Sequence, residues 1–358
     1  MSRTLSIGAL AGVALAMGLS AFAPAEATLA LTPDGITDGF TLTTFVSNYP
    51  FATPAGSEIY GPLAQGIAPN GNVITGSTAD QMIYVFKDVD NQTLANAISA
   101  TPYTPLPSTN TNPQYAMTTA GGQVYGAQLT DGTHFPPYEH FNSNGTHSII
   151  PGLATTIGNL FGEWGNPVNG HIIASSALGL IDIDPLAQTF RVIAPLLPAC
   201  GTPPVPNGCI DGVTVSPDGK TVYAAVVGGD ILAYDITTGA VLRLLSGQGR
   251  EPDGLGVISG GKFNGDVIVN NNDGTLGLID LTTGIEDIIA NGGTRGDFIS
   301  PDPSNGTAFI SQNERVDRLG CGPGCAIGSP VPAPEPASLS LLGAGLLAFA
   351  GLRFRRRG

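Results

Sequence analysis

The sequence is poor in charge, and above all in basic residues. Only 12% of its 358 residues are charged, and 14 lysines and arginines stand against 28 aspartates and glutamates. A chain this acidic repels nucleic-acid phosphates and anionic membrane surfaces. We therefore expect no nucleic-acid partner.

Recognisable catalytic motifs are also missing. The chain has no Gly-x-Ser-x-Gly elbow, no phosphate-binding P-loop and no His-Glu-x-x-His zinc motif. Its four cysteines provide no second pair at zinc spacing. Cys200 and Cys209 bracket a loop rich in Gly and Pro, and Cys321 and Cys325 flank Gly-Pro-Gly, so we expect two local disulfides, with a metal or redox site as the alternative.

Glycine and proline, by contrast, are abundant. The chain has 50 Gly and 29 Pro, and 42% of its residues are hydrophobic. This composition is typical of a protein with a large core and many turns rather than long helices. It predicts an all-β fold.

A repeat unit is clearest in residues 211–245. Two apolar runs flank the turn Ser-Pro-Asp-Gly at 216–219, and a second hairpin follows around 235–239. Five similar turns occur elsewhere, and the six together are Asn70-Gly71, Gly121-Gly122, Asn169-Gly170, Asp218-Gly219, Asn264-Gly265 and Asn305-Gly306. Their glycines recur every 41 to 51 residues, which predicts a six-bladed β-propeller.

The last blade lacks an outer strand, and the N-terminus can supply it. The run Phe40 to Val46 alternates as a strand does, and pairing it with the last blade would close the ring. We therefore expect a linker at 28–39, the propeller at 40–325 and a Pro-rich linker at 326–336.

The N-terminus has the features of a secretory signal peptide over residues 1–27. Arg3 precedes an apolar run from Leu5 to Phe22, and Ala25-Glu26-Ala27 is a small-x-small cleavage site. We expect signal peptidase to cut before Thr28.

The C-terminus has three parts in a fixed order. Pro334-Glu335-Pro336 is followed by an apolar segment from Ala337 to Leu352 and then by a basic end, so we expect transient anchoring of 337–358 in the inner membrane. This order resembles the PEP-CTERM sorting signal, also called an ice-binding-protein C-terminal domain, a label that implies nothing about ice. The resemblance implies cleavage by an exosortase in a Gram-negative bacterium that makes exopolysaccharide, and a final place at the cell surface or in the extracellular matrix.

The blades themselves resemble six-bladed NHL, SMP-30/gluconolactonase and strictosidine-synthase-like propellers. The run Ser-Pro-Asp-Gly-Lys-Thr-Val-Tyr at 216–223 is also similar to YVTN-type surface-protein repeats. These resemblances imply the fold, but propellers serve both as enzymes and as scaffolds.

Four carboxylates are expected at one rim of the ring, where the innermost strands begin. Asp211, Asp253 and Asp297 open the innermost strands of the last three blades, and Glu163 is assigned the comparable place in the third. Converging oxygen ligands suit Ca²⁺ or Mg²⁺. In SMP-30-like enzymes a divalent ion there polarises a lactone or ester carbonyl. The alternative is that these side chains cap strand starts and turns.

A long segment at 130–148 is expected to form a loop over the same rim. Its side chains His134, Phe135, Tyr138 and His140 are candidates for stacking on sugar rings. The alternative is that they pack down on the ring.

Two functions remain open at this point. The first is an exported, non-enzymatic propeller that binds an extracellular polysaccharide or another surface protein. The second is a divalent-cation-dependent lactonase, esterase or lyase that uses the rim carboxylates.

Overall fold

The computed structural model describes residues 28–51, 61–102, 114–129, 137–153, 157, 160–195, 210–226, 229–245, 250–296 and 298–330. The predicted signal peptide, the Cys200 and Cys209 pair and the predicted membrane tail lie outside these residues. Within the described ranges, no helix has the length and apolarity needed to cross a membrane.

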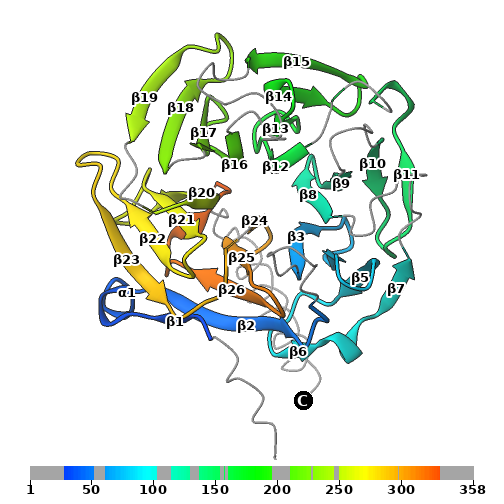
Figure 1. Cartoon of the computed structure of the whole chain (residues 1–358), viewed down its shortest axis with the longest axis horizontal. Coiled ribbons are helices and arrows are strands. Elements are labelled where there is room, and N and C mark those ends of the chain that lie inside the picture. The colour runs from blue at the N-terminus through cyan, green and yellow to red at the C-terminus, as the bar shows by residue number, and fades with distance from the viewer. Residues whose placement is uncertain are drawn as a thin grey trace, which may run out of the picture.

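Six antiparallel sheets stand around one axis, which confirms the six-bladed all-β propeller (Figure 1). From the axis outward, the first three blades are β3 (Pro62–Ile67), β4 (Val73–Ser77), β5 (Met82–Phe86) and β7 (Ser99–Pro102); β8 (Gln114–Ala120), β9 (Gln123–Leu129), β10 (Tyr138–Phe141) and β11 (His147–Ile149); and β12 (Leu160–Gly165), β13 (Ile172–Ser176), β14 (Gly179–Asp184) and β15 (Thr189–Ala194). The last three are β16 (Ile210–Val215), β17 (Thr221–Val226), β18 (Asp230–Asp235) and β19 (Val241–Leu245); β20 (Pro252–Gly260), β21 (Val267–Asn271), β22 (Leu276–Ile279) and β23 (Glu286–Asn291); and β24 (Ile299–Asp302), β25 (Thr307–Ser311), β26 (Val316–Gly320) and β2 (Thr41–Ser47).

Each of the six predicted turns joins the first two strands of a blade. The second residue of every pair is a glycine with a positive φ, between 71° and 98°. Glycine adopts this conformation without the steric cost that a Cβ imposes, which is why these dipeptides mark the inner hairpins in the sequence.

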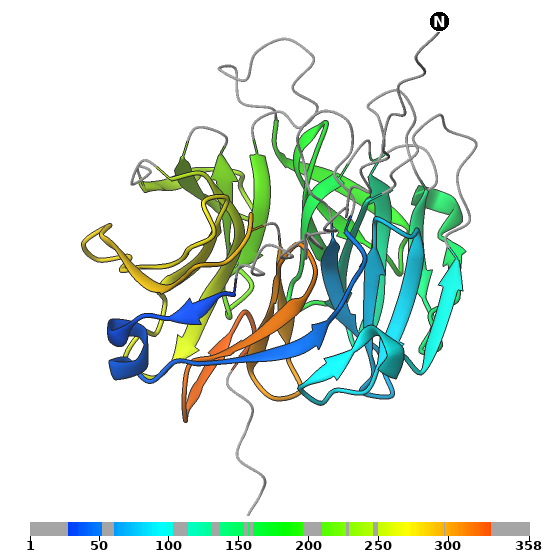
Figure 2. The same cartoon turned by 60° about the horizontal axis from the view of Figure 1, so that its bottom comes forward.

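The N-terminal strand closes the ring, as the alternating pattern at 40–46 predicts. β2 pairs antiparallel with β26, so that Thr41 faces Gly320 and Val46 faces Val316. Figure 2 shows the long blue strand beside the orange strands of the last blade. Phe45 is fully buried there and packs against Phe309 and Phe86, so the closure is sealed by apolar contacts between blades 6 and 1.

The two segments expected to be linkers contain ordered elements. Within 28–39, β1 (Ala30–Leu31) pairs with the outer edge of β23, and the short helix α1 (Pro33–Thr37) follows. At the other end, β27 (Cys325–Ile327) pairs with the end of β20. Both segments complete exposed strand edges of blade 5, a tertiary requirement that local composition does not reveal. Two further short elements lie between β5 and β7. They are β6 (Gln92–Thr93), which runs parallel to β2, and the 3₁₀ turn η1 (Leu94–Asn96). A second 3₁₀ turn, η2 (Pro151–Leu153), follows β11.

A buried arginine joins the closing blade to the first. Arg318, on β26, donates hydrogen bonds to Asp90 at 2.7 Å and Asp302 at 2.6 Å, and also to Asp88. Its guanidinium lies 4.7 Å from the ring centroid of Phe309. Because Asp88 and Asp90 belong to the segment after β5, one cation holds together the two blades that meet where the ring closes.

We expect Arg318→Met to lower the free energy of unfolding by about 3–5 kcal/mol, because the buried Asp302 would lose its cation. Urea unfolding at pH 7 measures the change. Lys262→Met is the matched control, because Lys262 and Asp38 form an exposed pair at 2.7 Å and its loss should cost at most about 1 kcal/mol. Equal losses in the two variants would show that Arg318 adds nothing beyond a surface ion pair.

Candidate functional site

The inner strand of blade 3 carries a buried carboxyl in its middle. Glu163, on β12, is 4% exposed, and Tyr138 of blade 2 donates a hydrogen bond to its Oε2 at 3.1 Å. Its Oε1 is buried and has no hydrogen-bonding partner among the described residues. Burial raises the pKa of Glu163 from 4.5 to about 8, and the bond from Tyr138 opposes this only in part. The pair therefore joins two blades through a carboxyl that keeps its proton at neutral pH.

Asp253, two blades further round the ring, is paired with a cation instead. Its Oδ2 lies 3.7 Å from Nη2 of Arg295, whose Nε donates to Asn272 Oδ1 at 3.1 Å. Arg295 is not among the site residues predicted from the sequence, although its place two residues before Asp297 was a usable signal. A guanidinium beside Asp253 occupies the electrostatic position that a bound cation would need.

Glu163 is not equivalent to Asp211 and Asp253, contrary to the sequence interpretation. Three glycines on neighbouring inner strands face one another. A Cβ on Gly162 would lie 2.8 Å from the Cα of Gly212, and a Cβ on Gly212 would lie 3.2 Å from the Cα of Gly254. Asp211 and Asp253 each precede their glycine, whereas Glu163 follows its own. The residue comparable to the two aspartates is therefore Phe161.

The strand pairing shows the same offset. In both blades the register shifts near the start of the inner strand, between Leu160 and Glu163 in blade 3 and between Ile210 and Val213 in blade 4. Glu163 then pairs with Ala174 as Val213 pairs with Ala224, so Glu163 corresponds to Val213 and not to Asp211. Because such a β-bulge adds a residue to one strand only, the sequence alone does not show which residues are equivalent.

The predicted calcium site stays a prediction. Across the ranges that the structure describes, no group of three or more His, Cys, Asp or Glu could hold a metal ion. Glu163, Asp211 and Asp253 are thus not brought together as one ligand set, and Asp297 lies outside the described residues. The carbonyl of Asp211 accepts a hydrogen bond from Ser175 at 2.5 Å, which ties blade 4 to blade 3.

Tyr138 and His140 lie in a blade strand and not in a rim loop. β10 pairs with β9, so that Tyr138 faces Ala127 and His140 faces Tyr125, and β11 completes the blade. Tyr138 is 1% exposed, while His140 contacts Gln123 at 3.0 Å and burial lowers its pKa. The polar residues at 139–148 concealed these outer strands from sequence analysis. His134 and Phe135 lie outside the described residues.

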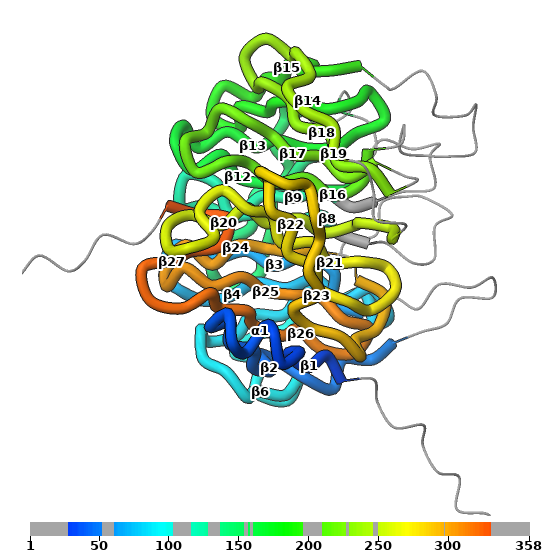
Figure 3. The backbone as a smooth tube through the Cα atoms, turned by 90° about the vertical axis from the view of Figure 1, so that its left-hand side faces the viewer, coloured from blue at the N-terminus to red at the C-terminus, as the bar shows by residue number. Residues whose placement is uncertain are grey.

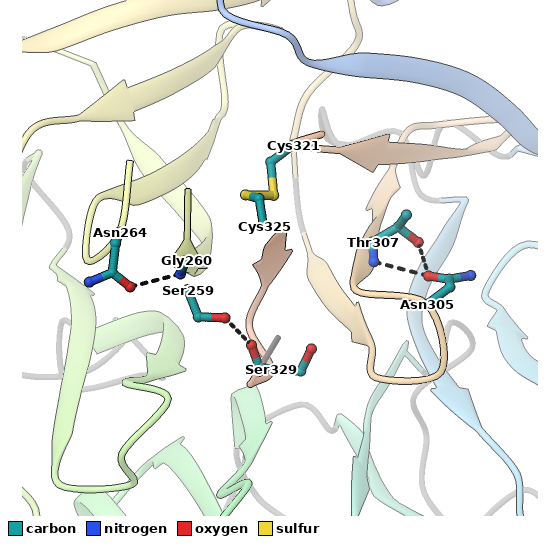
Figure 4. Close-up of a disulfide and its surroundings, with 8 residues drawn as sticks. All are labelled: Ser259, Gly260, Asn264, Asn305, Thr307, Cys321, Cys325 and Ser329. Carbon is teal, nitrogen blue, oxygen red and sulfur yellow. Dashed lines mark hydrogen bonds between the residues drawn. A yellow bond between two sulfur atoms is a disulfide. The ribbon is translucent and has the colours of Figure 1, made fainter. Parts of the chain in front are cut away.

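One of the two expected disulfides is present. Cys321 and Cys325 are joined, and the bond closes the turn between β26 and β27 (Figure 4). Cys200 and Cys209 fall in a range that the structure does not describe, as do Pro334, Glu335 and Pro336. The pairing of the first two cysteines therefore stays a prediction.

Comparison with known proteins identifies the end of the chain. Residues 332–357 match the PEP-CTERM protein-sorting motif. No curated protein matches the chain. Among solved structures, a streptogramin B lyase is similar at 15% identity and a TM-score of 0.48, over 78% of this chain and 97% of that one. A catalytically inactive virginiamycin B lyase from Staphylococcus aureus with quinupristin aligns at 12% identity and a TM-score of 0.48, over 78% of this chain and 99% of that one. Similarity at this level says nothing of activity.

The raised pKa of Glu163 predicts a pH-dependent cost to stability. The folded protein holds this proton to higher pH than the unfolded chain, so its contribution falls as pH rises from about 4.5 towards 8. From pH 5 to pH 9 the unfolding free energy of the wild type should fall by about 3–5 kcal/mol more than that of Glu163→Gln, because glutamine does not titrate. Urea unfolding at both pH values measures this.

Tyr138→Phe is the companion variant. Without the phenol donor the pKa of Glu163 should rise further, so stability should go on falling to a higher pH than in the wild type, and its total loss should be larger. Parallel pH profiles for the wild type and Glu163→Gln would contradict a buried neutral carboxyl.

Proposed function

We propose that this protein is an exported cell-surface or extracellular-matrix scaffold, sorted by an exosortase, which binds another surface protein or a glycan. The sorting motif at 332–357 supports export and sorting. The rigid six-bladed ring supports binding, because it holds its strands and loops in fixed positions. Of the two kinds of ligand, the surface favours a protein.

The observation that carries the proposal is an apolar patch on the outer strand of blade 4. In β19, Val241, Leu242 and Leu244 are 58%, 56% and 53% exposed. β19 is the last strand of its sheet, whereas the outer strands of blades 5 and 6 are covered by β1 and β6. Single exposed apolar residues are ordinary, but three on one edge strand are typical of a surface that binds protein.

The second candidate function is an enzyme, a lactonase, esterase or lyase. Its support is the Glu163 and Tyr138 pair, because buried carboxyls whose pKa lies near neutrality serve as general acids and bases. The divalent-cation version has less support, since Arg295 neutralises Asp253.

A retention assay tests the scaffold. We expect the combined Val241→Thr, Leu242→Ser and Leu244→Thr variant to bind isolated cell envelope and matrix about tenfold less tightly than the wild type, because each side chain buries apolar area at an interface. Ile36→Thr with Val168→Ser is the matched control, since these residues are 64% and 66% exposed elsewhere. Equal retention by both variants would contradict the role of the patch.

Pretreatment of the envelope separates the two ligand classes. Loss of retention after protease digestion would identify a protein, and loss after periodate oxidation would identify a glycan.

Calcium addition tests the alternative. Because Arg295 already neutralises Asp253, we expect Ca²⁺ to leave the Tm unchanged in both the wild type and an Asp211→Asn, Asp253→Asn variant. A rise of Tm with calcium concentration in the wild type alone would establish the metal site, since a ligand that binds only the folded state stabilises it by mass action.

A further inference from the structure

The axis of the ring is filled with side chains on the face where the inner strands end. A Cβ on Gly256 of blade 5 would lie 3.0 Å from Ile327, 3.2 Å from Ile299 and 3.8 Å from Trp164. Trp164 belongs to blade 3 and Ile299 to blade 6, which stand opposite each other in a ring of six. Side chains from opposite blades can meet only across the axis, so Trp164, Ile299 and Ile327 plug it.

The C-terminal segment is part of this plug. β27 pairs with Ile258, Ser259 and Gly260 at the end of β20. Gly328 donates its N–H to the carbonyl of Val257 at 2.6 Å and lies against Trp164 so closely that a Cβ would overlap the indole ring.

Two more contacts fix the segment in place. Ile327 donates its N–H to the carbonyl of Gly306 on blade 6. Ser259 donates to the carbonyl of Ser329 at 2.5 Å, as Figure 4 shows. We call the face that carries β27 the plugged face, and Figure 3 shows it at the left of the ring, seen edge-on.

The chain leaves the ring from the centre of the plugged face. Ser329 is 3% exposed, and Pro330, the last described residue, is exposed. The sorting motif begins at residue 332. Because an extended chain spans at most about 3.6 Å per residue, the seven Cα-to-Cα steps from Pro330 to the start of the predicted membrane segment at Ala337 allow a tether of roughly 25 Å.

We propose that the propeller is held with its plugged face against the membrane while the chain is anchored, and that the rim with Asp211 and Asp253 faces away. The proposal rests on the proposed sorting function and on the membrane anchoring that the sequence predicts for residues 337–358. The partner of the plugged face is thus the lipid surface.

The short tether enforces this orientation. A domain of about 300 residues has a radius of gyration near 19 Å, and hence an outer radius of roughly 25 Å. A tether that starts at the axis is therefore only long enough to reach the edge of the ring. The opposite rim cannot turn to the membrane unless the plug unfolds.

The orientation decides which surfaces a ligand can reach before the tail is cut. The outward rim and the circumference, including β19, are free in the anchored protein. The plugged face becomes available only after cleavage.

Energy transfer to the membrane tests the proposal. The chain from Thr28 to Gly358 is inserted into phosphatidylcholine and phosphatidylethanolamine vesicles that carry a headgroup acceptor dye, with a fluorescent non-natural amino acid at Leu186 or at Leu178. These exposed leucines, 87% and 40% accessible, lie at the two ends of β14, Leu186 at the plugged face and Leu178 at the outward rim. Because six residues of strand separate them by about 20 Å, transfer should be about twofold or more higher from Leu186.

Two controls keep the result interpretable. A flexible Gly-Ser segment of about 20 residues inserted after Pro330 should remove the difference, because it lengthens the tether beyond the radius of the ring. Equal transfer from the two sites without the insertion, or stronger transfer from Leu178, would overturn the proposed orientation. A full chain that does not float with the vesicles would overturn the anchoring itself, and with it the proposal.

Discussion

The pairing of β2 with β26 is the constraint on which the rest of the structure depends. A sheet blade has two edges, and a ring of blades is stable only when its first and last members are joined. The chain joins them with contacts between residues far apart in sequence, such as Thr44 with Asp317, which is 273 positions away. Because such contacts close a very long loop, they carry a large entropic cost, and the contacts of Arg318 with Phe45 and Phe309 help to hold the junction.

Ring closure also creates the electrostatic problem at the rim. Inner strands that converge on one axis bury the carboxyls they carry, and a buried charge without a partner is costly. The protein uses two solutions, a retained proton at Glu163 and a guanidinium at Asp253. The first leaves a carboxyl that can exchange a proton near neutrality, whereas the second places beside the carboxylate a guanidinium that stays charged at any ordinary pH.

The plug gives the ring two different faces. β27 and Trp164 fill the axis at one end, and the described chain ends beside them at Pro330, two residues before the sorting motif begins. A scaffold whose membrane anchor is attached at one face presents the other face and its circumference to partners. The apolar patch on β19 lies on that circumference, which makes the sorting signal and the proposed binding surface compatible in one molecule.

The sequence by itself determined the architecture of this protein, because its signals are local. Each inner hairpin needs a glycine with positive φ, an alternating strand near residue 40 completes the last blade, and Cys321 is close enough to Cys325 to bond with it. The site was decided by tertiary structure alone. The strand register placed Glu163 level with Val213 and not with Asp211, pairing with β9 made the polar stretch around His140 a blade strand, and Arg295 came to Asp253 from the connection between blades 5 and 6. These outcomes depend on how strands and blades pack against one another, and no local sequence pattern indicates that packing.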